Sequence, residues 1–365
     1  MPGCVVLALK EGKIIYEKAY GNFFYENESP VKLNTVYDLA SVTKICATTL
    51  SIMKLYEEGK INLKKKLSEY LTELKETNKK NITVENVLLH QAGLVSYIPF
   101  YKETIDINGY PLPTIYSNLP NDSFNVFVAQ NLYMKNTWVD TIYKRILLSP
   151  VGPTGKYVYS DNDFIFLAKL VERITNIPAS EYVMKYFYEP MKLKTIGFDP
   201  LARNSKINIA PTESEKVFRK QIIRGSVHDP GAAMMGGVAG HAGLFGNAYD
   251  LASVMQMLIS GGTYMGMQYL KKETVALFTT YNSKNSRRGY GFDKPEKDND
   301  TRKDPYPASI CSSFTFGHTG FTGTCTWADP INKLVFIFLS NRVYPDVNST
   351  FLKMNIRGKI MDCFY

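Results

Sequence analysis

The hydrophobic and polar positions near both ends of the chain follow the pattern of β-strands. Residues 5–9 read Val-Val-Leu-Ala-Leu, and residues 14–16 begin a second strand after a Lys-Glu-Gly-Lys turn. Near the other end, residues 314–326 are rich in Thr, Phe and Gly, and residues 333–339 form a buried strand after an Asp-Pro-Ile-Asn turn. The last segment predicts a closing helix from about residue 349 to residue 364.

The middle of the chain has a different periodicity. Helical spacing or helix start signals occur in four segments, which are residues 42–58, 163–175, 179–188 and 250–260. Residues 97–153 are irregular and rich in aromatic side chains, which indicates an extended connection or a lid-like insert of the kind that shapes a site.

These patterns predict an α+β fold in which strands from both ends join in one mainly antiparallel sheet. The sheet lobe takes about residues 1–28 and 305–365, and a helical lobe takes about residues 29–304. The sequence has no internal repeat and no low-complexity linker, so we expect a single domain over residues 1–365.

Composition and charge narrow the classes of function. Apolar residues make up 45% of the chain and charged residues 21%, which excludes disorder, collagen and coiled coil. The net charge is +9, but the lysines gather in residues 60–80 without interleaved aromatic residues, so we expect a solvated face and no nucleic-acid partner. The longest apolar run, residues 334–339, is too short to span a membrane, and we expect no secretory signal in the opening residues.

Cysteine and histidine spacing does not suggest a metal site. The five cysteines are an odd number without a Cys-x-x-Cys pair, and Cys46 lies in an apolar helical stretch typical of a core. The four histidines are far apart in the sequence. We therefore expect neither a disulfide framework nor a bound metal.

The sharpest local signal is a serine three residues before a lysine in apolar sequence. Residues 39–53 contain one charge, Lys44, and a buried lysine is unfavourable unless it is paired or used. Ser41 shares a helix face with Lys44 near the helix N-terminus, where free N–H groups favour a developing oxyanion. Desolvation would let Lys44 accept the serine proton. The alternative is a surface helix in which this common spacing arose by chance, and the uncharged flanks argue against it.

Two other segments carry candidate chemistry. Tyr159 precedes an amphipathic helix, and a tyrosine hydroxyl near a lysine can relay protons. A turn with a helix cap at Asp161 or Asp163 fits that segment equally well. Residues 316–324 place three glycines in strand-like sequence, which indicates either a ligand close to the backbone or a bulged edge strand.

Together the three segments resemble the serine β-lactamase and penicillin-binding protein superfamily, whose motifs are Ser-x-x-Lys, a middle hydroxyl motif and Lys-Thr-Gly on a strand. The order is the same here, with Ser41 first, Tyr159 in the middle and His318-Thr319-Gly320 late. Further segments resemble the class C-like branch, which includes esterases and D-amino-acid peptidases; these are residues 12–16, 38–44, 88–94 and 189–193. The resemblance covers nearly the whole chain and implies a β-lactamase/transpeptidase-like fold.

Two positions depart from the class C-like pattern. Its middle motif is Tyr-x-Asn, and Asp161 stands in the Asn place. Ser160-Asp161-Asn162 matches the Ser-Asp-Asn of other branches, but the neighbouring segments favour Tyr159. His318 replaces a lysine that would face a substrate carboxylate, and histidine is mostly neutral at pH 7. This replacement favours an esterase or peptidase-like relative over an efficient β-lactamase.

One more segment, residues 227–245, is similar to serine-hydrolase domains joined to family 3 glycoside hydrolases in Bacteroidetes-type bacteria. Those partners act on amino sugars of cell-wall fragments, so the resemblance implies a place in a longer, exported or periplasmic protein. His228 and His241 are candidates for the lining of the pocket, and a helix cap and a satisfied loop histidine explain them equally well.

The resemblance also implies roles for the motif residues. Ser41 is expected to be the nucleophile, with Lys44 and Tyr159 as the general-base and proton-relay pair in an order left open. The N–H groups of Ser41 and Phe321 are expected to form the oxyanion hole. The residues expected at the substrate are His318, Thr319, Gly320, Phe321 and Asp161. No cofactor is expected.

Three functions are open on the sequence alone. The first is a serine hydrolase that acts through an acyl-enzyme on an ester or amide, such as a cell-wall-derived peptide. The second is a true β-lactamase or a D-Ala-D-Ala carboxypeptidase of the penicillin-binding kind, and the third is an inactive module that binds peptidoglycan fragments. Intact Ser41, Lys44 and Tyr159 favour the first function over the third, and His318 favours it over the second.

Overall fold

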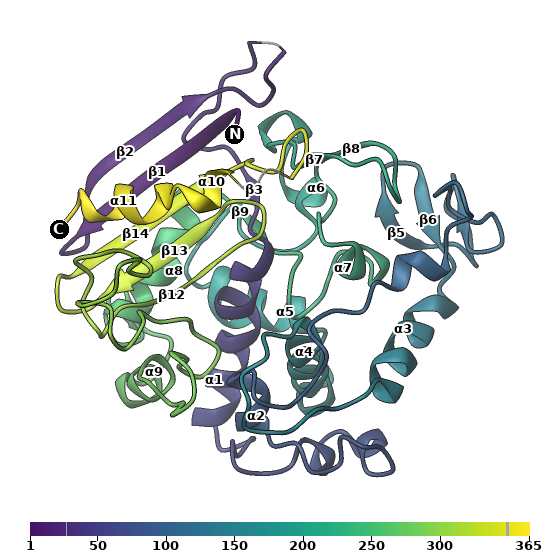
Figure 1. Cartoon of the computed structure of the whole chain (residues 1–365), viewed down its shortest axis with the longest axis horizontal. Coiled ribbons are helices and arrows are strands. Elements are labelled where there is room, and N and C mark those ends of the chain that lie inside the picture. The colour runs from purple at the N-terminus through teal and green to yellow at the C-terminus, as the bar shows by residue number, and fades with distance from the viewer. Residues whose placement is uncertain (27, 348–349) are drawn as a thin grey trace.

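Strands from the two ends of the chain meet in one sheet, as the hydrophobic pattern predicts (Figure 1). The computed structural model describes residues 1–26, 28–347 and 350–365. The sheet is antiparallel, with the strand order β12-β13-β14-β1-β2. Its strands are β1 (Gly3–Lys10), β2 (Lys13–Gly21), β12 (Phe316–Thr319), β13 (Cys325–Asp329) and β14 (Leu334–Ser340). The sheet built from both termini is therefore confirmed.

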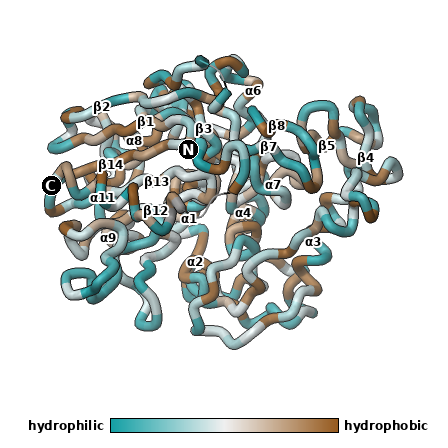
Figure 2. Tube along the Cα trace, turned by 45° about the horizontal axis from the view of Figure 1, so that its top comes forward, coloured by the Kyte–Doolittle hydropathy of each residue, from teal (hydrophilic) through white to brown (hydrophobic). Residues whose placement is uncertain are grey.

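The central strands of the sheet are apolar on both faces. Val5 and Ile337 face the large core, where helix α8 (Ala248–Ile259) packs against β1, β13 and β14. Val6 and Phe338 face the other way, into a smaller cluster closed by the C-terminal helix α11 (Ile356–Asp362). Figure 2 shows the apolar stretches of the strands lying inside the molecule. Burial on both faces explains why residues 334–339 are continuously apolar rather than alternating.

Most of the helices come from the middle of the chain. They are α1 (Leu50–Glu57), α2 (Val84–Leu88), α3 (Thr137–Leu148), α4 (Asp161–Thr175), α5 (Ala179–Val183), α6 (Pro200–Arg203), α7 (Pro230–Met234) and α9 (Lys272–Thr279). Short strands pair beside them as β3 (Tyr37–Asp38) with β9 (Phe245–Gly246), β7 (Glu213–Ser214) with β8 (Ile222–Ile223), and β10 (Thr263–Tyr264) with β11 (Met267–Gln268). No described helix is both long and apolar enough to cross a membrane.

The four predicted helices are present, with small shifts at their ends. The first lies in a 3₁₀ turn and a π-helical segment that lead into α1, and the second is α4. The third is α5, extended by a π-helical segment over Met184–Tyr188, and the fourth is α8.

Two expectations about the fold need correction. Residues 97–153 are not irregular throughout, because they contain α3 and a small sheet of β4 (Tyr116–Ser117), β6 (Leu132–Met134) and β5 (Val126–Ala129). Helix α3 is amphipathic and buries Ile142 and Ile146 fully on one face. The closing helix is divided into α10 (Thr350–Lys353) and α11, since Asn355 has a left-handed backbone between them. Residue 349, its expected start, lies outside the described residues.

Candidate active site

Ser41 lies in a tight turn between β3 and the helix that continues into α1. The 3₁₀ turn covers Ala40–Val42, and the π-helical segment covers Lys44–Thr49. Ala40 has a φ of 48°, which is unusual for a residue other than glycine. The buried Asp38 carboxylate holds the turn, because its Oδ1 accepts the Ala40 N–H at 2.8 Å. A strained residue thus fixes the backbone immediately before the candidate nucleophile.

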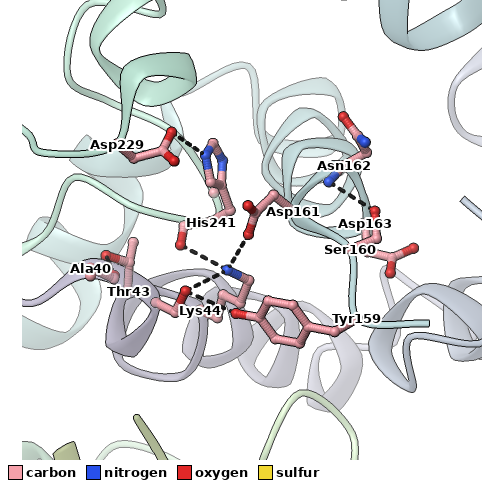
Figure 3. A network of polar contacts seen from close by, with 12 residues as sticks. Ala40, Thr43, Lys44, Tyr159, Ser160, Asp161, Asn162, Asp163, Asp229 and His241 are labelled. Carbon is pink, nitrogen blue, oxygen red and sulfur yellow. Dashed lines mark hydrogen bonds and ion pairs between the residues drawn. The ribbon is translucent and has the colours of Figure 1, made fainter. Parts of the chain in front are cut away.

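Polar groups from distant segments meet around the Lys44 ammonium, beside Tyr159, Asp161 and His241 (Figure 3). Lys44 Nζ donates a hydrogen bond to Ser41 Oγ at 3.0 Å, and the Tyr159 hydroxyl donates to the same oxygen at 2.8 Å. Lys44 Nζ also donates to Asp161 Oδ1 at 2.7 Å and to the peptide oxygen of His241 at 3.1 Å. The fold therefore gathers the serine, lysine and tyrosine of the first two motifs into one network.

Lys44 is a paired ammonium in this network. Burial lowers its pKa, but the Asp161 carboxylate and the Tyr159 hydroxyl more than offset burial, and the pKa is raised. Its three N–H donors are all used by three acceptors. Burial raises the pKa of Tyr159, although Lys44 acts in the opposite direction. Neither group is a free base in this state, so a proton must move within the network before Ser41 can be deprotonated.

The side chains of the middle motif point in different directions. The Ser160 hydroxyl donates to the Val95 peptide oxygen at 2.6 Å and caps α4 by accepting the Asn162 N–H at 3.2 Å. Asn162 Nδ2 donates to the same Val95 oxygen at 2.8 Å. The hydroxyl in contact with Ser41 is that of Tyr159, which favours Tyr-x-Asp over Ser-Asp-Asn. The helix cap is Ser160, not Asp161 or Asp163 as the sequence suggested.

His90 supports Tyr159 from behind, and the motif analysis did not single it out. The two rings lie 4.5 Å apart. His90 Nδ1 lies 2.7 Å from Asp163 Oδ2 and 3.2 Å from the Ser160 N. Burial raises the pKa of Asp163 well above its usual range, and burial with nearby cations such as Arg288 holds the pKa of His90 well below its own. Both shifts favour the uncharged forms of the two groups.

Strand β12 brings His318 close to the serine network. The His318 side chain is buried, and its Nδ1–H donates a hydrogen bond to the Thr319 peptide oxygen at 2.7 Å. The centre of its ring lies 6.0 Å from that of the Tyr159 ring. Burial, assisted by the neighbouring Arg288 guanidinium, lowers the pKa of His318 to about 3. His318 is consequently neutral at pH 7. The sequence predicts the same state from the ordinary pKa of histidine, whereas in the structure the cause is burial.

The turn after β12 comes into direct contact with the segment before Ser41. Thr324 Oγ1 donates to the Leu39 peptide oxygen at 3.1 Å. A Cβ atom at Gly320 would lie 2.5 Å from that oxygen and 2.1 Å from Thr324 Oγ1, so the position requires glycine. Phe321 follows, about half exposed. The candidate oxyanion-hole residues, Ser41 and Phe321, therefore belong to segments that pack on each other.

Arg288 is a cation of the site that the sequence analysis missed. Its side chain is 3% exposed, and Nη2 donates to the Tyr157 hydroxyl at 3.0 Å. Nε lies 3.6 Å from Asp293 Oδ1, and the guanidinium carbon lies 5.5 Å from the centre of the Tyr159 ring. Nη1 is buried and has no hydrogen-bond partner among the described residues. Two adjacent arginines in a polar loop were the only signal, and no spacing rule connects them to a serine far away in sequence.

The active site opens into a cavity of about 650 Å³. Among its walls are Ser41, Tyr159, Asp161, Thr319, Phe321 and Arg288. The two histidine candidates also line it, and each is held by a carboxylate: His228 Nε2 lies 2.8 Å from Glu213, and His241 Nε2 lies 2.9 Å from Asp229. The His228 ring stacks on that of Phe321 with centroids 5.5 Å apart.

One group of side chains has the composition of a metal site. Asp161, Asp229 and His241 offer ligand atoms within 4.8 Å of one another. The Lys44 ammonium, 2.7 Å from Asp161, already supplies a positive charge there, and a metal ion would be repelled by it. The donor set therefore fits an ion pair and not a metal.

Comparisons with known proteins identify the family of the chain. The sequence matches the family described as Beta-lactamase over residues 1–358. A protein of Escherichia coli (strain K12) named "Putative D-alanyl-D-alanine carboxypeptidase" is 33% identical over 372 residues, which cover 95% of this chain and 80% of that protein.

Two solved structures share the fold at low sequence identity. The hydrolase EstCE1, described as having promiscuous acyltransferase activity, superposes with a TM-score of 0.68 at 20% identity, over 98% of this chain and 93% of its own. A class C β-lactamase from Rhodobacter sphaeroides gives a TM-score of 0.66 at 14% identity, over 100% and 95% of the two chains. Both have the α+β fold predicted from the resemblance. The chain belongs to the β-lactamase family of serine hydrolases.

Proposed function

We propose that the protein hydrolyses an amide bond through an acyl-enzyme on Ser41, and that its substrate is a peptide ending in a carboxylate, such as a D-Ala-terminated cell-wall peptide. The proposal rests on two features, the Ser41 network and the buried guanidinium of Arg288 in the same cavity. The name of the Escherichia coli relative points to the same substrate class.

In the proposed reaction, Ser41 Oγ attacks the scissile carbonyl carbon. Its proton passes through the Tyr159 and Lys44 pair to the leaving nitrogen, and the C–N bond breaks. The N–H groups of Ser41 and Phe321 hold the developing oxyanion. Thr319 and Gly320 form the strand end along which the substrate lies, and Asp161 keeps Lys44 charged and in place.

Arg288 is the residue that selects a substrate with a carboxylate. A lysine is absent from the start of the third motif, and His318 cannot supply a charge at neutral pH. The Arg288 guanidinium supplies that charge nearby, with a buried Nη1 that lacks a partner among the described residues. Hydrogen bonds between a guanidinium and a carboxylate are about twice as strong as neutral ones. Binding of a substrate carboxylate would give this buried donor an acceptor.

A second candidate function is hydrolysis of small neutral esters. The neutral state of His318 favours it, because no fixed cation stands at the position where the family has lysine. If this is the function, we expect faster turnover of such esters than of penicillins or D-Ala-terminated peptides at pH 7. Fusion to a glycoside hydrolase stays an expectation from residues 227–245, without support from the relatives described above.

The experiment compares kcat/KM for a D-Ala-D-Ala peptide, nitrocefin and a p-nitrophenyl ester in the wild type and in Arg288→Met. We expect the variant to lose at least about tenfold on the two carboxylate-bearing substrates and to keep its ester activity, which serves as the control for folding. Equal losses on all three substrates, or wild-type ester turnover far above peptide turnover, would favour the ester function instead. Ser41→Ala should lose covalent labelling by a fluorophosphonate, and retained labelling would refute the nucleophile.

A further inference from the structure

Two arginines from the last part of the chain line the same cavity as Ser41 and have no role in the reaction described above. They are Arg342 and Arg357, called the arginine pair below. Arg342 Nη2 donates a hydrogen bond to the Phe321 peptide oxygen, and Arg357 Nη1 donates one to the Thr324 peptide oxygen at 2.9 Å. The arginine pair is therefore attached to the turn after β12, which carries a candidate oxyanion-hole residue.

The two guanidiniums are close enough to affect each other. Burial, together with the charge of Arg357, lowers the pKa of Arg342. The guanidinium carbon of Arg342 lies 5.3 Å from the centre of the Phe321 ring, which places its charge beside that residue. Neighbouring like charges repel each other, and an anion bound to both would offset this repulsion.

The carboxylates that line the cavity are engaged elsewhere. Among the described residues, each of them lies within ion-pair distance of another cation or of a histidine. These pairs are Asp161 with Lys44, Asp229 with His241, and Asp293 with Arg287 and Arg288. Arg357 forms no ion pair with any residue that the structure describes, so the protein leaves its charge unbalanced on the wall of the cavity.

Arg357 also keeps hydrogen-bond donors available. A guanidinium carries five N–H groups. Within the part of the chain that the structure describes, Nη1 is the one nitrogen of Arg357 with an acceptor, the Thr324 oxygen. Arg357 and Thr319 also line one smaller recess together. The available donors therefore lie close to the strand end along which the substrate is expected to bind.

The arginine pair is a different binding position from that of Arg288. Arg288 contacts the Tyr157 hydroxyl and Asp293. The arginine pair instead contacts peptide oxygens of the turn after β12. A substrate whose terminal carboxylate is held by Arg288 would leave the arginine pair without an anion, unless the substrate carries a second one.

We propose that Arg342 and Arg357 form a second anion-binding subsite, and that the substrate is a peptide with two carboxylates, one held by Arg288 and the other by the arginine pair. Arg357 supplies the hydrogen-bond donors, and Arg342 adds positive charge beside Phe321. The inference rests on the proposed function, because it takes the contact between Arg288 and the terminal carboxylate as given.

The test measures binding by isothermal titration calorimetry in the Ser41→Ala variant, which consumes no substrate. The ligands are N-acetyl-D-Ala-D-Ala, with one carboxylate, and two dicarboxylates, N-succinyl-D-Ala-D-Ala and N-acetyl-D-Ala-D-Glu, which place the second carboxylate on either side of the scissile bond. We expect one dicarboxylate to bind roughly tenfold more tightly than the monocarboxylate, the scale of a hydrogen bond to a charged group. Adding Arg357→Met should remove this preference. Arg357→Lys should keep part of it, because lysine retains the charge without the guanidinium fork.

Arg145→Met is the matched control. It removes the same charge from a surface ion pair of α3 with Glu103, away from the cavity lining, and should leave the preference unchanged. Each preference is a ratio of two affinities within one variant, so a partly unfolded sample does not alter it. The proposal is overturned if neither dicarboxylate is preferred, if the preference survives Arg357→Met, or if Arg145→Met lowers it as much.

A separate measurement judges the proposed function, namely hydrolysis of N-acetyl-D-Ala-D-Ala by the wild type. Hydrolysis without a preference for either dicarboxylate would refute the second subsite alone. A preference that depends on Arg357, without hydrolysis of any of the three peptides, would refute the proposed function and leave the subsite in place. The two failures can therefore be told apart.

Discussion

At the scale of single residues, Asp161 determines the charge of Lys44 in the serine network. It stands where the class C-like pattern has asparagine, and its carboxylate lies 2.7 Å from Lys44 Nζ. An asparagine could accept the same hydrogen bond without a negative charge. The aspartate therefore stabilises the ammonium form of Lys44, and an asparagine would do so less. The pH dependence of activity should report this choice.

We expect Asp161→Asn to move the acidic limb of the kcat/KM profile to lower pH. Asp161 raises the pKa of Lys44, so its removal lowers that pKa and lets the lysine lose its proton at lower pH. The measurement is kcat/KM for a neutral ester between pH 5 and about 10, a range that spans the ordinary pKa of histidine and approaches that of lysine. An unmoved limb would show that Lys44 does not govern the profile.

Tyr159 and Ser160 differ in direction although they are adjacent, and this difference can be tested. Tyr159→Phe removes the hydroxyl that contacts Ser41, and kcat should fall roughly 10²-fold. Ser160→Ala removes the cap of α4, which should reduce the free energy of unfolding by about 1 kcal/mol and affect kcat much less. Steady-state kinetics and urea unfolding of both variants measure these effects. A larger loss of kcat in Ser160→Ala would restore the Ser-Asp-Asn interpretation.

At the scale of elements, the site depends on the contact between the end of β12 and the turn that carries Ser41. The two segments are far apart in sequence, and they approach closely because Gly320 has no side chain. The separation of His318 and Phe321 from the serine is therefore set by this contact.

Gly320→Ala should lower both stability and activity. The added Cβ would overlap Thr324 Oγ1 and the Leu39 peptide oxygen, and overpacking of this kind costs about 1–3 kcal/mol. The matched control is Gly152→Ala, whose Cβ would meet only the Gly93 oxygen at 3.6 Å, an ordinary contact. Urea unfolding and kcat/KM of both variants are the measurements. Comparable effects at Gly152 would contradict the role given to the β12 contact.

At the scale of the whole molecule, the central sheet separates two apolar clusters. The site lies toward the large core, and the smaller cluster lies on the opposite face under α11. Stability and catalysis should therefore be separable by substitutions on the far face of the sheet.

Phe338→Ala is expected to reduce the free energy of unfolding by about 3–5 kcal/mol, because it leaves a cavity in the smaller cluster beside Phe351. The kcat of the folded fraction should change little, since Phe338 faces away from the large core. Ile331→Ala is the control, as that side chain is 62% exposed. Denaturation and active-site titration together make the comparison. A loss of kcat in the folded fraction would show that packing on the far face of the sheet also affects the active site, contrary to this prediction.

The sequence alone determined those features that depend on local spacing. Short, continuous apolar runs at both ends, bounded by turn residues, predicted the strands of the sheet. The distance of three residues between Ser41 and Lys44 predicted a shared helix face, since helical geometry fixes that relation. The same reasoning was not carried through for residues 97–153, although α3 is amphipathic and buries Ile142 and Ile146 on one face.

The tertiary structure alone decided which distant groups meet and what charge they carry. Arg288 and Tyr157 are 131 positions apart, and His90 and Asp163 are 73 apart, so no spacing rule brings them to one site. Charge states follow from burial and neighbours, as for His318, whose pKa falls to about 3 beside Arg288. Such shifts arise because desolvation and Coulomb interactions act through space and not along the chain.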